Sequence, residues 1–421
     1  MERNFNIGAR GFLESAGALL FMNLLANALN YGYQILLARV LSVEAFGIMY
    51  VIFSLLMILA VPGNTFTMLA AKEVAVRLSR NCRSGAWEYV GDLTKKVTFL
   101  SCAVFFCGLA VYVPLKALLH MDDPLALGLT VLACALGYYH PLFSGCLSGM
   151  RRFVFLGLYG LMIPAYKLLG AAAALPFQTD RSRMAVLLLS IVLGSAATAV
   201  IGWRYLKQRL DVPGETVSSE GAKYDRALWG ESFAINICFA LYVNIDVIAA
   251  QHIGGESLSG IYSAASLFGK MLYYCAVSVG TVLLPAAATA EAGERAALLR
   301  RTLLAVSGVS AAGLLLVNLL KRPLIQLIYG AKYLPAADYM AVVSLLSFSI
   351  ALLTVLTNYF IGIARTRRIR NALLALALWL AGAVFFSSGV KTALAIIGCG
   401  GLLCDLYLSA SYFRDVRRGA P

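Results

Sequence analysis

Long apolar segments recur along the whole chain, and each is about 20 residues long or longer. A helix of that length spans a hydrocarbon core of about 30 Å. Backbone N–H and C=O groups find no water in lipid, so helices must satisfy them internally. We therefore predict an all-α polytopic membrane protein with about twelve transmembrane helices. The expected ranges are 12–38, 45–71, 97–119, 124–149, 153–177, 184–206, 229–252, 258–288, 302–320, 336–363, 371–388 and 392–413.

The basic residues divide unevenly between the two sides of this arrangement. When the connections alternate between sides, 25 of the 35 Lys and Arg residues fall on one side, 8 fall on the other, and Lys167 and Lys270 lie inside helices. The positive-inside rule then predicts that both termini are cytoplasmic and that the protein lies in the cytoplasmic (inner) membrane. The same placement explains the net charge of +14 as a topological signal. We therefore expect membrane lipids as partners and no nucleic acid.

The longest basic connection, 207–228, contains Pro213 and Gly214, a composition typical of a linker. It predicts an N-terminal six-helix lobe at 1–206 and a C-terminal six-helix lobe at 229–421. The two halves also resemble each other, because Gly47-Ile48 and Gly260-Ile261 follow similar polar and acidic residues. Each half has an even number of spans, so the repeat is parallel. These features predict two bundles around a central cleft.

The second helix of each half carries helix-breaking residues, Pro62-Gly63-Asn64 in the first half and Gly280 and Pro285 in the second. Paired interruptions of this kind indicate a binding site between repeats. The alternative is that they are kinks needed only for packing.

Four side-chain amides, Asn23, Asn27, Asn30 and Gln34, are spaced 4, 3 and 4 residues apart in the first expected helix. This spacing places them on one helix face. The face either lines a polar pathway or holds another helix, since amides also join helices in lipid.

Three ionisable residues, Lys167, Lys270 and Asp246, lie in the middle of expected spans. A charge at that depth is costly, so such residues usually face protein or water and mark a pathway. The spacing of Tyr262, Ser266, Lys270 and Tyr273 places these four on one helix face. These residues either mark a transport pathway or form a structural ion pair, such as Lys270 with Asp246.

No nucleotide-binding loop, zinc-protease motif or nucleophile elbow occurs in the chain, and the nine cysteines form no C-x-x-C pair. We therefore expect no enzyme activity, cofactor or metal site. A membrane-embedded glycan polymerase or ligase is the alternative from another class. It is disfavoured because the expected outer connections are short, and the longest, 321–335, bears three cations and no acid.

Several short motifs resemble the polysaccharide-transporter family of the multidrug/oligosaccharidyl-lipid/polysaccharide exporter superfamily, which comprises flippases for O-antigen and capsule oligosaccharides. They are Leu36-Leu-Ala-Arg39-Val-Leu-Ser42, Glu44-Ala-Phe-Gly47-Ile, Asn244-Ile-Asp246-Val-Ile, Gly260-Ile-Tyr262-Ser-Ala-Ala265 and Leu283-Leu-Pro285.

The resemblance implies a flippase that moves a polyprenyl-diphosphate-linked oligosaccharide by alternating access, with the glycosyltransferases or polymerase of the same pathway as candidate partners. A multidrug/cation antiporter or a lipid II-type flippase of the same superfamily is the alternative. The candidate substrate-binding residues are Lys167, Lys270, Asp246, Asn27, Asn30, Gln34 and Tyr273.

Overall fold

The computed structural model describes residues 9–80, 82–111, 123–211, 226–289, 292–363, 365–387 and 389–417. All the regular elements there are helices, so the prediction of an all-α polytopic membrane protein is confirmed. Nine segments of the described residues are long and apolar enough to span a membrane, and a tenth is the bent pair α2 and α3. Each of the twelve ranges expected from the sequence overlaps a helix, with α1 covering 12–38 and α10 covering both 229–252 and 258–288. Residues 112–119 of the third range lie outside the described residues.

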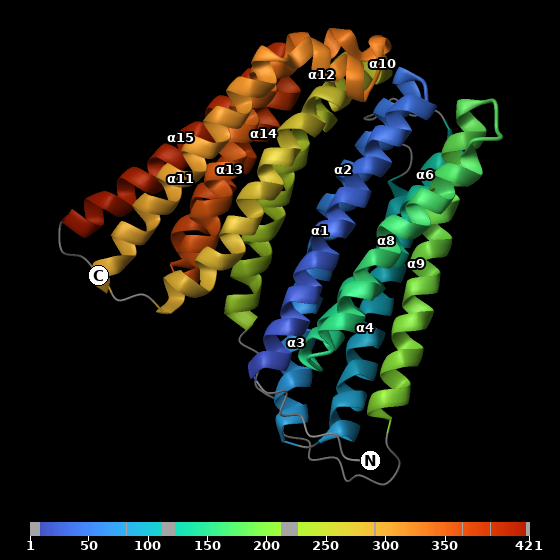
Figure 1. Cartoon of the computed structure of the whole chain (residues 1–421), viewed down its shortest axis with the longest axis vertical. Helices are drawn as coiled ribbons and strands as arrows, with labels where there is room; N and C mark the ends of the chain where they lie inside the picture. Colours follow the sequence, from blue (N-terminus) through green and yellow to red (C-terminus); the bar gives the residue numbers. More distant parts are fainter. Residues whose placement is uncertain are drawn as a thin grey trace. The chain divides into compact units, whose positions relative to one another are not determined.

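The chain forms two compact units (Figure 1). The helices of unit 1 are α1 (Ala9–Val40), α3 (Val61–Ser79), α4 (Arg83–Ala110), α6 (Pro124–Gly137), α7 (Tyr139–Gly149), α8 (Phe153–Ala174) and α9 (Asp180–Leu210). Those of unit 2 are α2 (Val43–Leu59), α10 (Arg226–Thr289), α11 (Ala292–Leu319), α12 (Lys321–Ile328), η1 (Ala331–Tyr339), α13 (Met340–Gly362), α14 (Thr366–Phe386) and α15 (Val390–Arg417). Most of the expected linker, 212–225, lies outside the described residues.

The second span is divided between the units. Its first part, Ser42–Ile58, packs in unit 2, although the sequence analysis placed this segment in the N-terminal lobe. Contact with α10 explains the assignment, because a Cβ on Gly47 would lie 2.6 Å from the Gly260 nitrogen and 2.6 Å from the Glu256 carbonyl oxygen. Only glycines allow backbones to approach this closely. The glycines that mark the sequence repeat therefore pack against each other.

The expected interruptions of the two second helices have different outcomes. In the first half, α2 and α3 meet at a 41° bend just before Pro62. Proline at a helix start is compatible with its missing N–H. In the second half, α10 remains helical through Gly280 and Pro285, so a break there is not observed. The break in α10 lies instead at Gly255, whose φ of 71° favours glycine.

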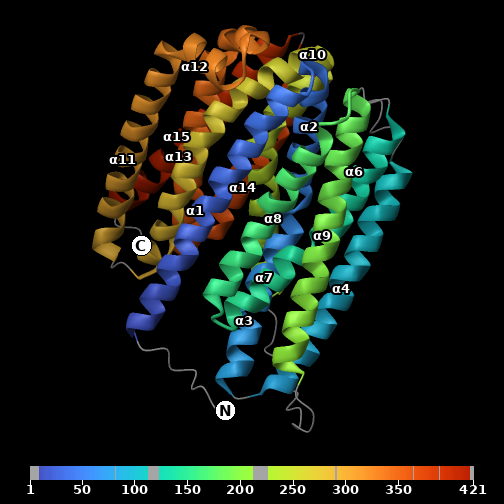
Figure 2. The same ribbon diagram turned by 45° about the vertical axis from the view of Figure 1, so that its right-hand side comes forward.

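Unit 1 is organised by close helix crossings and by capped helix starts. A Cβ on Gly145 would lie 2.4 Å from the Thr67 carbonyl oxygen, so α7 and α3 cross in direct backbone contact. Figure 2 shows α4, α6 and α9 running alongside one another in this unit. The expected start of α4 at residue 97 is wrong, because the helix continues back to Arg83 through polar residues.

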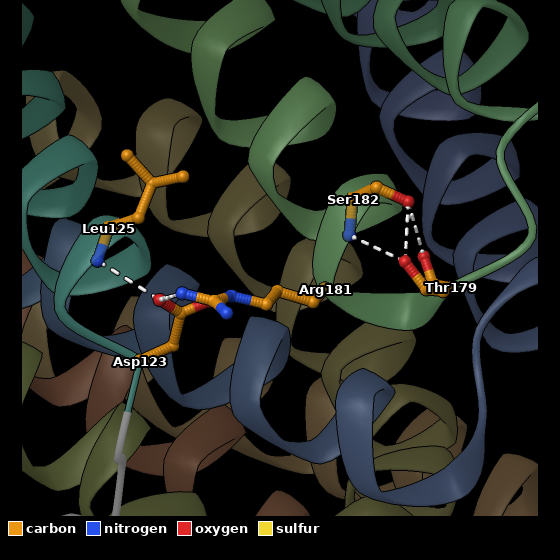
Figure 3. Close-up of polar contacts among 5 residues, drawn as sticks. All are labelled: Asp123, Leu125, Thr179, Arg181 and Ser182. Atoms are coloured by element: carbon orange, nitrogen blue, oxygen red, sulfur yellow. Dashed lines mark hydrogen bonds and ion pairs between the residues drawn. The ribbon is translucent and has the colours of Figure 1, made fainter.

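Polar caps fix the starts of α6 and α9 (Figure 3). The Asp123 carboxylate accepts a hydrogen bond from the Leu125 N–H at 3.1 Å and pairs with the Arg181 guanidinium at 3.2 Å. The Thr179 hydroxyl accepts a bond from the Ser182 N–H at 3.3 Å. Caps of this type satisfy N–H groups that have no partner within the helix. The Asp123–Arg181 pair also joins the two helix starts.

Candidate functional site: one lysine in each unit

Lys270 lies on α10 within unit 2, where its side chain is buried. Its ammonium group donates a hydrogen bond to the side-chain oxygen Oδ1 of Asn244 at 3.2 Å and lies 4.9 Å from the centre of the Tyr50 ring. The Asn244 amide nitrogen donates to the Ala240 carbonyl oxygen at 3.0 Å. That bond fixes the orientation of the amide, so its oxygen remains available to the lysine. The described partners of the Lys270 ammonium are therefore a neutral amide and an aromatic ring.

Asp246 lies close to this lysine and is also buried. Its Oδ2 atom accepts hydrogen bonds from the Tyr262 hydroxyl at 2.8 Å and the Ser266 hydroxyl at 2.9 Å. Its Oδ1 atom is buried and has no hydrogen-bond partner among the described residues. A buried carboxylate oxygen without a donor is unfavourable. The Oδ1 atom of Asp246 is therefore available to a hydrogen-bond donor, a proton or a cation.

A small cavity with room for about one water molecule joins these groups. Its lining includes Asp246, Tyr262, Ser266, Lys270 and Tyr273. The four residues that were expected on one face of the eighth span therefore line the same cavity. No ion pair joins Asp246 and Lys270 in the described part of unit 2, so the expected alternative of a direct pair is not observed. Two opposite charges nevertheless share one enclosed space, which lowers the cost of burying each.

Lys167 lies on α8 in unit 1, where its side chain is half-buried. Its ammonium group donates a hydrogen bond to the side-chain oxygen Oδ1 of Asn30 at 3.3 Å and lies 5.8 Å from the centre of the Tyr33 ring. The Asn30 amide nitrogen donates to the Ala26 carbonyl oxygen at 3.0 Å, one turn back along α1. The arrangement repeats that of Lys270, Asn244 and Tyr50, although the two lysines lie on helices that are not equivalent in the repeat.

The remaining amides of α1 have different environments. Asn23 and Asn27 are exposed, whereas Gln34 is half-buried and its Oε1 atom has no hydrogen-bond partner among the described residues. The structure thus places Asn30 in contact with Lys167, whereas Asn23 and Asn27 are exposed on the surface of unit 1. Among the candidates, Lys270, Asp246 and Tyr273 form one group in unit 2. Asn27, Asn30, Gln34 and Lys167 belong to unit 1.

Sequence reasoning missed several participants. Asn244 and Tyr50 bind Lys270, and Tyr33 contacts Lys167, but none of the three was a candidate. The Asn244-Ile-Asp246 motif indicates Asn244 as a candidate site residue, because it places an amide two residues from a carboxylate within one span. Tyr50 gave no signal, since tyrosine is common near membrane interfaces.

Asp405 is a second buried carboxylate of unit 2. Its Oδ2 atom accepts a hydrogen bond from the Ser349 hydroxyl at 2.7 Å, and its Oδ1 atom has no hydrogen-bond partner among the described residues. It lies well inside α15, which extends to Arg417.

No protein-family model matches the chain, and no curated protein matches it in sequence. Solved structures do match its fold. An inward-facing multidrug resistance MATE family transporter of the MOP superfamily is 12% identical, with a TM-score of 0.72 over 94% of this chain and 96% of that one. The lipid II flippase MurJ in an inward closed conformation is 14% identical, with a TM-score of 0.70 over 94% of this chain and 87% of that one.

A third similar structure is a MOP superfamily transporter from Pyrococcus furiosus, described as having a binding pocket of reverse polarity. It is 12% identical, with a TM-score of 0.60 over 95% of this chain and 94% of that one. These likenesses extend over nearly the full length of the chain. Together they show that this multi-pass membrane protein has the fold of MOP superfamily transporters.

Proposed function

We propose that the protein is a flippase that moves a polyprenyl-diphosphate-linked oligosaccharide across the cytoplasmic membrane by alternating access, without ATP. The observation that carries the proposal is the repeated arrangement of a lysine, an asparagine side-chain oxygen and a tyrosine ring in each unit. The amide and the ring are neutral, so neither of them cancels the charge of the ammonium, although Lys270 also shares its cavity with Asp246. The lysines can exchange these amide and ring contacts for a diphosphate oxygen.

An anion needs such a counter-charge, because a bare diphosphate in hydrocarbon is prohibitively unfavourable. Lysine suits a transported ligand, since its ammonium is a mobile point charge with three donors and no fixed fork geometry. Transport requires binding that is strong enough for entry and weak enough for release. The fold shared with MurJ and MATE transporters supports a transport function, while the lysines support an anionic headgroup.

A second candidate function is a multidrug/cation antiporter of the same superfamily. The observation that favours it is the pair of buried carboxylates in unit 2, Asp246 and Asp405, each with one oxygen that has no described donor. Such oxygens suit a cationic ligand or a proton. In this reading Lys270 stabilises the Asp246 carboxylate, and neither lysine meets the substrate. A glycan polymerase remains the alternative outside transport.

The test uses the full chain in liposomes with a fluorescent, short-chain polyprenyl diphosphate that carries a disaccharide. The proposal predicts movement between leaflets without ATP, with or without an imposed ion gradient. It also predicts a strong loss for Lys270→Gln and little change for Lys391→Gln. Lys391 is a matched control, because its ammonium lies 5.2 Å from the Tyr339 ring but the residue is exposed.

Three results would count against the proposal. Efflux of a cationic dye with no movement of the glycolipid would favour the antiporter. Growth of the disaccharide into longer chains would favour the polymerase. Glycolipid movement that is equal in the wild type and in Lys270→Gln would remove the lysine from the mechanism.

A further inference from the structure

The helix α1 presents three faces of different character along its middle section. Its exposed apolar face includes Phe21 and Leu24, with 66% and 57% of their surfaces accessible. At about 100° per residue, Asn23 and Asn27 project about 160° and 120° away from Phe21, and Leu24 lies between Phe21 and Asn27. A third face packs on α8, where Met22 meets Gly157. Figure 2 shows α1 and α8 side by side in unit 1.

This distribution separates the surroundings of the two exposed faces. Large exposed apolar side chains on a helix of a membrane protein indicate the lipid side. An amide in hydrocarbon without a partner costs several kcal/mol. Asn23 and Asn27 lie on the side of α1 away from Phe21, so we infer that their exposed amides meet water or a polar ligand. The structure describes no intramolecular hydrogen bond for either side chain, although each amide offers two donors and one acceptor oxygen.

The Lys167 ammonium lies at one end of this amide face, held by Asn30. The helix rises about 10 Å from Asn23 to Asn30, which is longer than one sugar ring. Resting on the proposed function, a diphosphate bound at Lys167 would place the first sugars of its glycan along Asn27 and Asn23. Amides suit hydroxyl groups, because the same side chain can both donate and accept.

We propose that the exposed amides Asn23 and Asn27 form a glycan-reading subsite, which selects the sugar portion of the substrate while Lys167 binds its diphosphate. Hydrogen-bonding groups that read a hydroxyl discriminate strongly against a substrate without it, because they are left unpaired. A lysine that binds phosphate cannot provide that discrimination. The two subsites therefore bind different parts of the same substrate, its sugars and its diphosphate.

The experiment compares two probes in liposomes, a short-chain polyprenyl diphosphate with a disaccharide and the same diphosphate without sugar. The readout is the ratio of their transport rates. Asn23→Leu/Asn27→Leu is expected to lower that ratio by about tenfold for each hydrogen bond lost. Lys167→Gln is expected to slow both probes alike and leave the ratio unchanged. Asn27→Gln, which retains an amide, should keep part of the ratio.

Asn358→Leu is the matched control, because Asn358 is a half-buried span asparagine whose amide is bonded to the Thr354 carbonyl of its own helix at 2.9 Å. It should not change the ratio. A ratio unchanged in Asn23→Leu/Asn27→Leu, at normal thermal stability, would overturn the glycan-reading subsite and leave the proposed function standing. Wild-type protein that moves neither probe would contradict the proposed function itself. If the double variant is unstable, Asn27→Leu alone decides, because one lost bond still predicts a lower ratio.

Discussion

The two lysine sites share a pattern but differ in their surroundings. Lys270 is buried in unit 2 and shares a small cavity with Asp246, whereas Lys167 is half-buried in unit 1 beside an exposed amide face. A buried lysine near a carboxylate has a structural consequence, because removing it leaves the acid uncompensated. A lysine at a polar surface can meet a ligand at little cost to folding. The comparison predicts that Lys270 couples stability and transport, and that Lys167 affects chiefly transport.

The largest effect is expected for Lys270→Met. Loss of the ammonium leaves Asp246 as a buried charge and is expected to lower stability by about 3–5 kcal/mol. Lys270→Met/Asp246→Asn should restore most of that stability without restoring transport. Thermal unfolding and flipping of the same preparations measure both quantities. Equal unfolding temperatures for the wild type and Lys270→Met would show that Lys270 does not compensate Asp246.

The next effect separates transport from folding at the other site. Lys167→Gln removes a charge-assisted contact of about 1.5–3 kcal/mol, so glycolipid flipping should fall by about 10- to 100-fold. Its unfolding temperature should change little, because the residue is half-buried. Lys167→Arg keeps the charge and should keep part of the rate. Parallel losses of stability and transport in Lys167→Gln would erase the distinction between the two sites.

The asparagines provide a third comparison. Asn244→Leu leaves a buried ammonium without its amide acceptor, which is expected to cost about 1–3 kcal/mol of stability. Asn30→Leu should cost less, since water can reach the half-buried Lys167. Urea unfolding of the two variants in detergent gives the difference directly. A larger loss for Asn30→Leu would mean that the unit 1 site is the drier of the two.

The tyrosine rings are expected to give the smallest effect. A double-mutant cycle with Tyr50→Leu and Lys270→Met should give a coupling free energy of about 0.5–2 kcal/mol. The corresponding cycle for Tyr33 and Lys167 should be smaller, because 5.8 Å separates the ammonium and the ring there against 4.9 Å at Tyr50. Zero coupling in both cycles would show that the rings only fill space.

The sequence predicted the helices well and the site partly, for different physical reasons. Apolar length and charge asymmetry depend on the membrane as solvent, so both can be seen without tertiary structure. The helical face of Tyr262, Ser266, Lys270 and Tyr273 was also predictable, since it follows from spacing within one helix. The Lys167–Asn30 contact joins α8 and α1 and required the folded packing.

The division of the second span between the two units could not be predicted from the sequence. The hydropathy pattern gave one span at 45–71 and assigned it to the N-terminal lobe. The backbone contact between Gly47 and Gly260 holds its first part in unit 2, and the bend near Pro62 lets the remainder pack in unit 1. Glycine positions were visible in the sequence, but their contact partner was not. Tyr50 was missed as a partner of Lys270 for the same reason.

The central claim is that Lys167 and Lys270 provide the counter-charge for a diphosphate that crosses the membrane. The most direct test is flipping of the disaccharide-linked polyprenyl diphosphate by Lys167→Ala/Lys270→Ala, reconstituted in the same amount as the wild type. Lys391→Ala serves as the control for loss of an exposed lysine. We expect transport by the double variant to fall to the level of protein-free liposomes. Transport equal to that of the wild type would contradict the account.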